Sequence, residues 1–528
     1  MNGEAMKFDE NQPFNLCDGK DTVKLTSSVT LMPGPIYILS CQLFVEDGAV
    51  LTIAAGVTIY AIPETQAKKP TVIVVNKGGR IVADGDTDLP ITFTAINPTS
   101  SSDGTIVVDS NAASGTTAAK ETRGKWGGIV ILGKAPTTES ETKEIEGLDG
   151  YGYGGVDPYD ASGVLRYVRV WHAGAAIAAD NELNGITFGG VGSGTVVEYV
   201  EVAFNADGGF EFFGGTVNVK YLSVLFVGDD AFDSDQGYQG KGQFLFAMIG
   251  NEGHHGTEMD GKYNKQPRSH PQFYSMTIIG GGANSNKKDG LMRLREGTGG
   301  KFGNVVLAYG RGLGLNVDKC SGKTKQECCS RAGFYTKLPT TRDADDNTIL
   351  NTAISIGTGA RGTQSSDGYL YFSDNNIIYG VDYAGDSFNT FDTDCMNNPN
   401  FDADDVKPVV IEADPGFAHV DANALDYTVL SSAFNPLPST TGKMCMTSTD
   451  DATVVDPKFF EAVDCKGAFG GSAVEDNWLR GWSWLDCAGR MADGTCSTGV
   501  DWTPFAMLGA GGKEVETISG GALRGFVD

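Results

Sequence analysis

Residues 197–215 read VEYVEVAFNADGGFEFFGG, and residues 219–237 read VKYLSVLFVGDDAFDSDQG. The two stretches align without a gap, and Tyr199 falls on Tyr221, 22 residues further along the chain. Short runs of Val, Tyr and Phe that end in glycine are typical of β-strands. A repeat of this length is too short for a propeller blade, which needs about 40 residues, and matches one turn of a solenoid. The two stretches therefore predict a parallel β-helix in which like residues stack from coil to coil.

The same pattern extends in both directions along the chain. Residues 165–170 (LRYVRV) begin like the two repeats, and a weaker copy begins at residue 273 with FYSMTIIG. Nearer the N-terminus, residues 43–61 and 71–95 alternate short apolar strands with glycine turns. We therefore predict an all-β fold, a right-handed parallel β-helix (solenoid) with a Cys-rich C-terminal cap.

The predicted solenoid divides the chain into three parts. Residues 1–40 form an N-terminal lead-in, and residues 41–381 form the parallel β-helix. Within it, residues 320–347 are charged and Cys-containing, which predicts an inserted loop tied by disulfides. Residues 382–528 hold the last coils and a Cys- and Trp-rich cap, because the open end of a solenoid exposes strand edges that must be covered.

Cysteine content and chain ends predict where the protein works. Its ten cysteines show no zinc-ligand spacing, so disulfides formed in an oxidising compartment are favoured. No apolar run approaches the roughly 18 residues of a membrane span. The first residues, MNGEAMKF, lack the basic and apolar regions of a signal peptide. We therefore expect an extracellular or cell-surface protein whose signal peptide is absent from this sequence.

The balance of charges restricts the partners. With 40 basic and 67 acidic residues, the formal net charge is −27. Nucleic acid and anionic membrane surfaces are disfavoured, because binding them requires clustered cations. The expected partner is a glycan or a cell-surface protein.

Acidic residues recur at matching positions of the two repeats. If the coils stack at the sheet spacing of about 4.8 Å, Asp207 lies beside Asp229 and Glu211 lies beside Asp233. Carboxylates this close need a bridging cation or a proton, unless they point outward into water. A solvated turn, a Ca²⁺ site and a catalytic site therefore all remain open. The predicted Ca²⁺ ligands are Asp207, Glu211, Asp229, Asp230, Asp233 and Asp235.

Several segments resemble a known family. They are GKWGGIVILGKAP (124–136), FNADGGFEFFGGTVNVKYL (204–222), GDDAFDSDQGYQGKGQF (228–244), ADPGF (413–417) and FFEAVDCKGAFGG with NWLRGW (459–471 and 477–482). Together they resemble secreted or lipid-anchored right-handed parallel β-helix proteins, pectate-lyase-like, that are common in marine and gliding bacteria. The resemblance implies fold and secretion, while the family has no established activity. Cys465 stands where that family is expected to have an aromatic residue, which suggests additional disulfides.

A second resemblance points to catalysis. Parallel β-helix hydrolases that cut polygalacturonate carry, in order, Asn-x-Asp, Asp-Asp, Gly-His-Gly and Arg-x-Lys motifs. This chain has similar motifs at 205–207, 229–230, 253–256 and 293–295, with arginine in place of the final lysine. The resemblance implies an inverting mechanism with one acid and two water-activating carboxylates. It assigns these roles to Asp207, Asp229 and Asp230, with His255 tuning the acid and Arg293 holding a sugar carboxylate.

Two other groups of residues suggest binding sites. His254 and His255, with Glu258 and Asp260, suggest a transition-metal site, although no third histidine follows at ligand spacing. Most phenylalanines of the repeats are expected in the core, whereas Tyr238 and the tyrosines of YGYGG (151–155) are candidates for stacking on sugar rings. We favour an extracellular structural or binding protein stabilised by Ca²⁺, with a polygalacturonase-type hydrolase as the alternative.

Overall fold

The fold comes from a computed structural model that describes residues 14–318 with short gaps, several pieces between 334 and 445, and residues 456–496 except 493. The gaps are 64–69, 96–98, 101–105, 108–122, 140–142, 146–147, 149, 179–180, 262–264, 287–289 and 297. The pieces are 334–335, 370–372, 376–381, 391–393, 414–417, 425, 430, 432–439 and 444–445.

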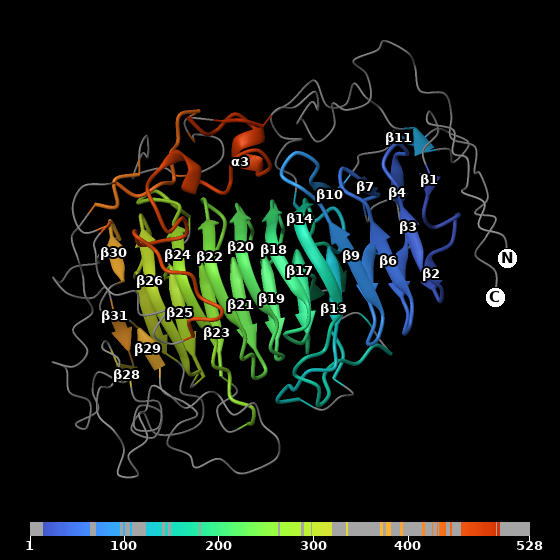
Figure 1. The fold of residues 1–528 in the computed structure, drawn as a ribbon, viewed down its shortest axis with the longest axis horizontal. Coiled ribbons are helices and arrows are strands. Elements are labelled where there is room, and N and C mark those ends of the chain that lie inside the picture. Colours follow the sequence, from blue (N-terminus) through green and yellow to red (C-terminus); the bar gives the residue numbers. More distant parts are fainter. Residues whose placement is uncertain are drawn as a thin grey trace.

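Two long parallel sheets make up the described fold, which confirms the predicted β-helix (Figure 1). The 16-stranded sheet contains β1 (Phe14–Asn15), β3 (Val29–Leu31), β4 (Tyr37–Leu39), β6 (Val50–Ile53), β7 (Thr58–Ala61), β9 (Arg80–Asp84), β10 (Ile91–Ala95), β14 (Gly163–Trp171), β18 (Val196–Ala203), β20 (Asn218–Leu225), β22 (Lys241–Met248), β24 (Gln272–Ile279), β26 (Gly300–Ala308), β28 (Phe334–Tyr335), β29 (Leu370–Phe372) and β30 (Ile377–Tyr379). We call it the long-strand sheet.

The 11-stranded sheet, which we call the short-strand sheet, contains β2 (Thr22–Leu25), β5 (Gln42–Val45), β8 (Val72–Val75), β13 (Ile129–Leu132), β17 (Ile186–Gly189), β19 (Phe210–Phe213), β21 (Phe232–Asp235), β23 (Thr257–Asp260), β25 (Met292–Arg295), β27 (Leu315–Asp318) and β31 (Phe391–Thr393). Two small antiparallel pairs lie outside both sheets, β11 (Thr99–Ser100) with β12 (Ile106–Val107), and β15 (Ala176–Ala178) with β16 (Asn181–Glu182).

The sequence repeat sets the register of the coils. In β18 and β20, Val197 pairs with Val219, which is the predicted offset of the repeat. The rings of Tyr199 and Tyr221 stack with centroids 4.2 Å apart and an interplanar angle of 3°. The predicted ladder of like residues along one axis is therefore confirmed.

Each long strand bends at one residue, and in four consecutive coils that residue is aromatic. Tyr167, Tyr199, Tyr221 and Phe244 all have positive φ angles, 47°, 54°, 56° and 61°, and their rings stack at centroid distances of 4.5, 4.2 and 4.8 Å. We call these four residues the aromatic ladder. A left-handed backbone at a residue other than glycine costs about 1–3 kcal/mol. Stacking and burial of the rings offset this cost, and the bend gives each coil its corner.

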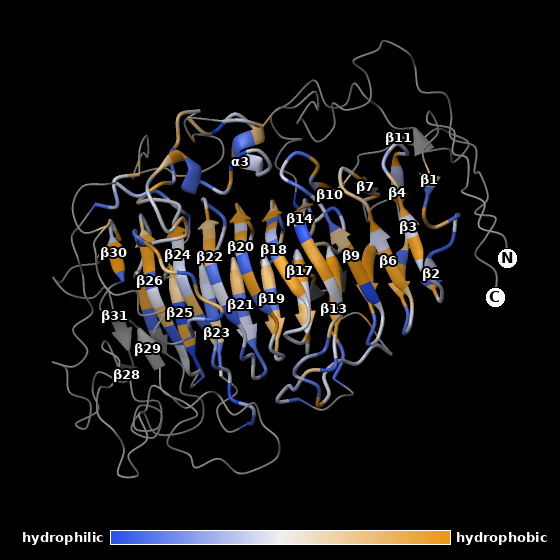
Figure 2. Ribbon diagram, viewed as in Figure 1, coloured by the Kyte–Doolittle hydropathy of each residue, from blue (hydrophilic) through white to orange (hydrophobic). Residues whose placement is uncertain are grey.

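The interior of the solenoid is filled by apolar side chains from both sheets. Val, Ile, Leu and Phe side chains alternate inward along the strands and form one continuous buried cluster from Leu16 to Val381. Figure 2 shows these strands as mostly hydrophobic, with hydrophilic colours concentrated in the loops. Each coil buries the apolar face of its neighbour, as a solenoid requires.

A second buried cluster joins the long strands to the C-terminal region. Residues 456–496, which we call the C-terminal strap, contain the 3₁₀-helix η3 (Val474–Asp476) and the helix α3 (Trp484–Cys487). The strap lies beside the long-strand sheet (Figure 1). There Trp482 and Trp478 approach the aromatic ladder edge-on. The predicted Cys-rich C-terminal region is therefore present. Its described residues pack along the side of the solenoid, against the apolar surface of the aromatic ladder.

Disulfides brace both ends of the described chain. Cys17 is bonded to Cys41, and two more disulfides, Cys445–Cys465 and Cys487–Cys496, lie in the C-terminal region. No free cysteine occurs among the described residues. These bonds confirm the predicted Cys-rich bracing and the expectation that Cys465 forms a disulfide.

The domain boundaries stay predictions. Described residues lie near two of them, the start of the β-helix at residue 41 and the loop at 320–347. Strands β1–β4 already pair in parallel with the next coil, so coiling begins before residue 41. Of the predicted loop at 320–347, only β28 is described; its other residues, and with them the predicted disulfide ties, lie outside the described residues. Among the residues with described positions, no helix is both long and apolar enough to span a membrane.

Candidate functional site

A column of charged residues runs along the outer face of the short-strand sheet. Alternation along a strand sends every second side chain outward. In β19, β21, β23 and β25, Glu211 pairs with Asp233, Asp233 with Glu258, and Glu258 with Arg293. The predicted neighbourhood of Glu211 and Asp233 is confirmed, and the column continues through two further coils.

A cluster of carboxylates and histidines forms beside this column, at the start of β21 and β23. The Nδ1 atom of His255 lies 2.8 Å from Asp230 Oδ1, and Nδ1 of His254 lies 3.5 Å from the same oxygen. The backbone N–H of His255 also donates to this oxygen at 2.8 Å. Asp230 and His255 are buried, whereas the His254 side chain is 30% exposed and Asp229, 3.1 Å from it, is 49% exposed. The cluster therefore opens to solvent on the side of His254 and Asp229.

Two arginines in β25 close the other side of the cluster. Arg293 Nη1 lies 3.1 Å from Glu258 Oε1, and Arg295 pairs with Glu258 Oε2 and, at 2.5 Å, with Asp260 Oδ1. Glu258 Oε1 is also 3.7 Å from His255 Nδ1. Glu258 thus connects the arginines to the histidines.

The local environment shifts the pKa values of the carboxyl groups in opposite directions. Burial raises the pKa of Asp230, but hydrogen bonds and charge from His254 and His255 outweigh it and hold the pKa well below its usual range. For Glu258, burial and then the charge of Asp230 raise the pKa to about 7. The pKa values of Glu211 and Asp233 also lie well above the usual range, first because of burial and then because of neighbouring carboxylates. One ionised carboxylate therefore lies among others that resist ionisation.

Two groups in this cluster have the geometry to hold a metal ion. The oxygens of Asp230, Asp233 and Glu258 lie within 4.8 Å of one another, and so do ligand atoms of Asp230, His254 and His255. Asp233 Oδ1 is buried and accepts no hydrogen bond from any residue that the structure describes.

Only two of the six predicted Ca²⁺ ligands lie close enough to other ligands to form a metal-binding group. Asp230 and Asp233 belong to a three-ligand group, whereas Asp207, Glu211, Asp229 and Asp235 do not fall in such a group among the described residues. Asp207 and Asp229 each precede their strand by three residues and so occupy equivalent turns of neighbouring coils. Asp235 lies on the same face of the sheet, and after burial its charge is the next contribution to the raised pKa of Glu211.

A family model described as a pectate-lyase-like β-helix domain matches residues 23–120 and 113–354 of the chain. The chain belongs to this family. No curated protein and no solved structure matches it. Membership in the pectate-lyase-like β-helix family confirms the resemblance and the fold, but a fold alone does not assign a substrate.

The polygalacturonase-type roles stay predictions for this family member. Asp230, His255 and Arg293 do lie in one cluster, joined through Glu258. However, Asp230 is buried and its pKa is low, so it is ionised and cannot donate a proton as a general acid. Arg293 is engaged with Glu258, which occupies the guanidinium expected to hold a sugar carboxylate.

Two of the tyrosines proposed for sugar stacking, Tyr153 and Tyr238, are buried, so the expectation was wrong for them. Tyr238 is fully buried and donates to the carbonyl of Val217 at 2.8 Å. Tyr153 is buried and bonds Gln236 at 2.7 Å, and Tyr151 stacks on Phe44 with centroids 4.3 Å apart. Tyr151 is half-buried, so stacking on a sugar ring stays a prediction for this residue alone.

Proposed function

We propose that the protein is an extracellular β-helix scaffold, stabilised by Ca²⁺ at Asp230, Asp233 and Glu258, that presents its charged face to a glycan or a cell-surface protein. One observation carries the proposal. Three carboxylates from adjacent coils bring oxygens within 4.8 Å of one another, and the buried Oδ1 of Asp233 accepts no hydrogen bond from a described residue.

Calcium fits these residues chemically. Ca²⁺ binds six to eight oxygens at 2.3–2.6 Å, so oxygens on opposite sides of the ion lie up to about 5 Å apart. Burial and then repulsion from neighbouring carboxylates raise the pKa values of Asp233 and Glu258, and a bound cation would offset the repulsion. Each carboxylate oxygen accepts more than one partner, so the ion pairs of Glu258 with the arginines orient it without using up its lone pairs. The three disulfides among the described residues fit an extracellular location.

The hydrolase alternative is less well supported. Its acid must be a protonated, accessible carboxyl group, whereas Asp230 is buried and ionised. Asp229 is accessible, but His254 lies between it and the buried part of the cluster, with 3.1 Å to Asp229 and 3.5 Å to Asp230.

Calcium titration of the metal-stripped protein tests the scaffold proposal. Thermal unfolding is followed with Ca²⁺, with Mg²⁺ and with chelator. We expect Ca²⁺ to raise the melting temperature, by a stabilisation of about 2.7 kcal/mol at a concentration 100 times the Kd. Asp233→Asn should remove this rise, and Asp88→Asn, at an exposed turn, should retain it. A wild-type melt that Ca²⁺ leaves unchanged would refute the calcium site.

A glycan array followed by analysis of the recovered glycans distinguishes a binding protein from a hydrolase. The scaffold proposal predicts that bound glycans are recovered intact from both the wild type and Asp229→Ala. Shortened oligosaccharides from the wild type and none from Asp229→Ala would establish the hydrolase instead.

A further inference from the structure

We propose that His254, His255 and Asp230 form a second divalent-metal site, with the ligand chemistry of a transition ion such as Zn²⁺ or Cu²⁺. This inference goes beyond the calcium scaffold. It shares only Asp230 with the oxygen ligands of that proposal and uses nitrogen ligands that Ca²⁺ does not favour.

The three ligand atoms lie within 4.8 Å of one another. Both imidazole Nδ1 atoms face the same carboxylate oxygen, Asp230 Oδ1, at 3.5 Å from His254 and 2.8 Å from His255. The two imidazole rings are 3.9 Å apart between centroids. Tetrahedral zinc with bonds of 2.0–2.1 Å places its ligand atoms about 3.3 Å apart. The observed separations lie on either side of this value, so small side-chain rotations suffice to bind the ion.

The backbone holds the two histidines in this arrangement. The N–H of His254 donates to the carbonyl of Asp229 at 3.1 Å, and the carbonyl of His255 accepts from Ala231 at 3.0 Å. Both bonds tie the turn before β23 to the turn before β21. Since the ligands come from two coils that are already in register, little reordering is needed on binding.

The chemistry of the ligands selects the metal. Neutral imidazole nitrogen suits zinc, copper and nickel, whereas oxygen ligands suit calcium and magnesium. Three protein ligands leave a fourth position for water, and the 30% exposure of His254 gives an ion access from solvent.

Cu²⁺ and Zn²⁺ titrations of the metal-stripped full chain test this site. Isothermal titration calorimetry with Zn²⁺ gives stoichiometry and Kd, and electron paramagnetic resonance with one equivalent of Cu²⁺ reports nitrogen coordination directly. We expect one ion per chain and a copper spectrum with nitrogen hyperfine splitting. His254→Ala should weaken Zn²⁺ binding at least about tenfold and reduce the nitrogen splitting.

Matched variants separate this site from the calcium site. Asp233→Asn, which removes a predicted calcium ligand, should leave the Zn²⁺ Kd and the copper spectrum unchanged. His254→Ala should leave the effect of Ca²⁺ on melting unchanged, and circular dichroism should show that it folds. Absence of Zn²⁺ binding to the wild type, a copper spectrum without nitrogen splitting, or a Zn²⁺ Kd unchanged in His254→Ala would overturn the proposal.

Discussion

Glu201 is a fully buried carboxyl group at the junction between the β-helix and the C-terminal strap, and we predict that it makes folding stability depend on pH. It accepts hydrogen bonds from the backbone N–H of Trp484 at 2.8 Å, the hydroxyl of Ser223 at 3.0 Å and the indole N–H of Trp171 at 3.1 Å. Burial raises its pKa to about 7, although these bonds and the charge of Arg169 lower it.

The sign of the effect follows from proton binding. In the unfolded chain Glu201 ionises near its ordinary pKa of 4.5, whereas in the folded protein it keeps its proton up to about pH 7. Between these values the folded state binds more protons, so the free energy of unfolding falls as the pH rises. At 1.36 kcal/mol for each unit between the two pKa values, the full loss is at most about 3 kcal/mol.

Urea unfolding between pH 4.5 and pH 8 at constant salt measures this loss. The matched variant is Glu201→Gln, whose amide oxygen accepts the same N–H groups while the Ser223 hydroxyl turns to accept from the amide nitrogen. Other carboxyl groups contribute equally in both proteins, so the difference between the two pH profiles isolates Glu201. We expect wild-type stability to fall by up to about 3 kcal/mol more than that of the variant. Parallel profiles would refute the assignment of this proton to Glu201.

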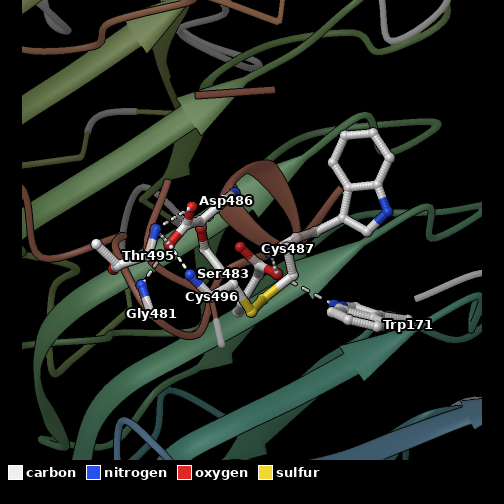
Figure 3. Close-up of a disulfide and its surroundings, with 9 residues drawn as sticks. Trp171, Gly481, Ser483, Asp486, Cys487, Thr495 and Cys496 are labelled. Atoms are coloured by element: carbon white, nitrogen blue, oxygen red, sulfur yellow. Dashed lines mark hydrogen bonds between the residues drawn. A yellow bond between two sulfur atoms is a disulfide. The ribbon is translucent and has the colours of Figure 1, made fainter. Parts of the chain in front are cut away.

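Two further predictions concern the backbone and the strap. Gly163→Ala should lower the free energy of unfolding by at least about 3 kcal/mol, because φ is +134° and a Cβ would lie 1.7 Å from the carbonyl oxygen of Ile81. The control Gly48→Ala, with φ +81° and no atom within 4 Å of the added Cβ, should lower it by only about 1 kcal/mol. Equal losses of stability for the two variants in chemical denaturation would contradict this reasoning. Asp486→Ala should destabilise the strap by at least about 2 kcal/mol, because the carboxylate accepts hydrogen bonds from the backbone N–H groups of three residues (Figure 3). Asp486→Asn should retain part of this stability, because its amide oxygen still accepts. Identical melting temperatures of the two variants would show that these hydrogen bonds do not stabilise the strap.

The fold was predictable from the sequence where the coils have equal length. The gapless repeat fixed the pairing of Phe210 with Phe232 and of Glu211 with Asp233, because a strand repeat of constant length must stack like on like. The next coils are longer: Thr257 follows Phe232 by 25 residues, and Met292 follows Thr257 by 35. These unequal lengths hid the continuation of the charged column into Glu258 and Arg293.

The centre of the site was less predictable than its location. The sequence pointed to Asp230 and His255, but not to Asp230 as the common partner of both histidines, since that contact depends on how two turns of different length meet. A Cys- and Trp-rich C-terminal region was predictable from composition, but its position along the side of the solenoid was not, because Trp484 contacts Glu201 across 283 residues and no periodic pattern connects them. Residue spacing predicts contacts between neighbouring coils, whereas such distant contacts depend on surface shape.

The strap is synthesised after the coils it covers, so the fold can be completed only late in translation. It holds residues of several coils at once, Glu201 in β18, Gln243 in β22 and Thr277 in β24. At a translation rate of 5–20 residues per second, the 283 residues between Glu201 and Trp484 take roughly 15–60 s to synthesise. Throughout that interval the aromatic rings of the coils remain uncovered on a nascent chain, and a folding helper that binds exposed aromatic surface has that long to act before the protein covers them itself.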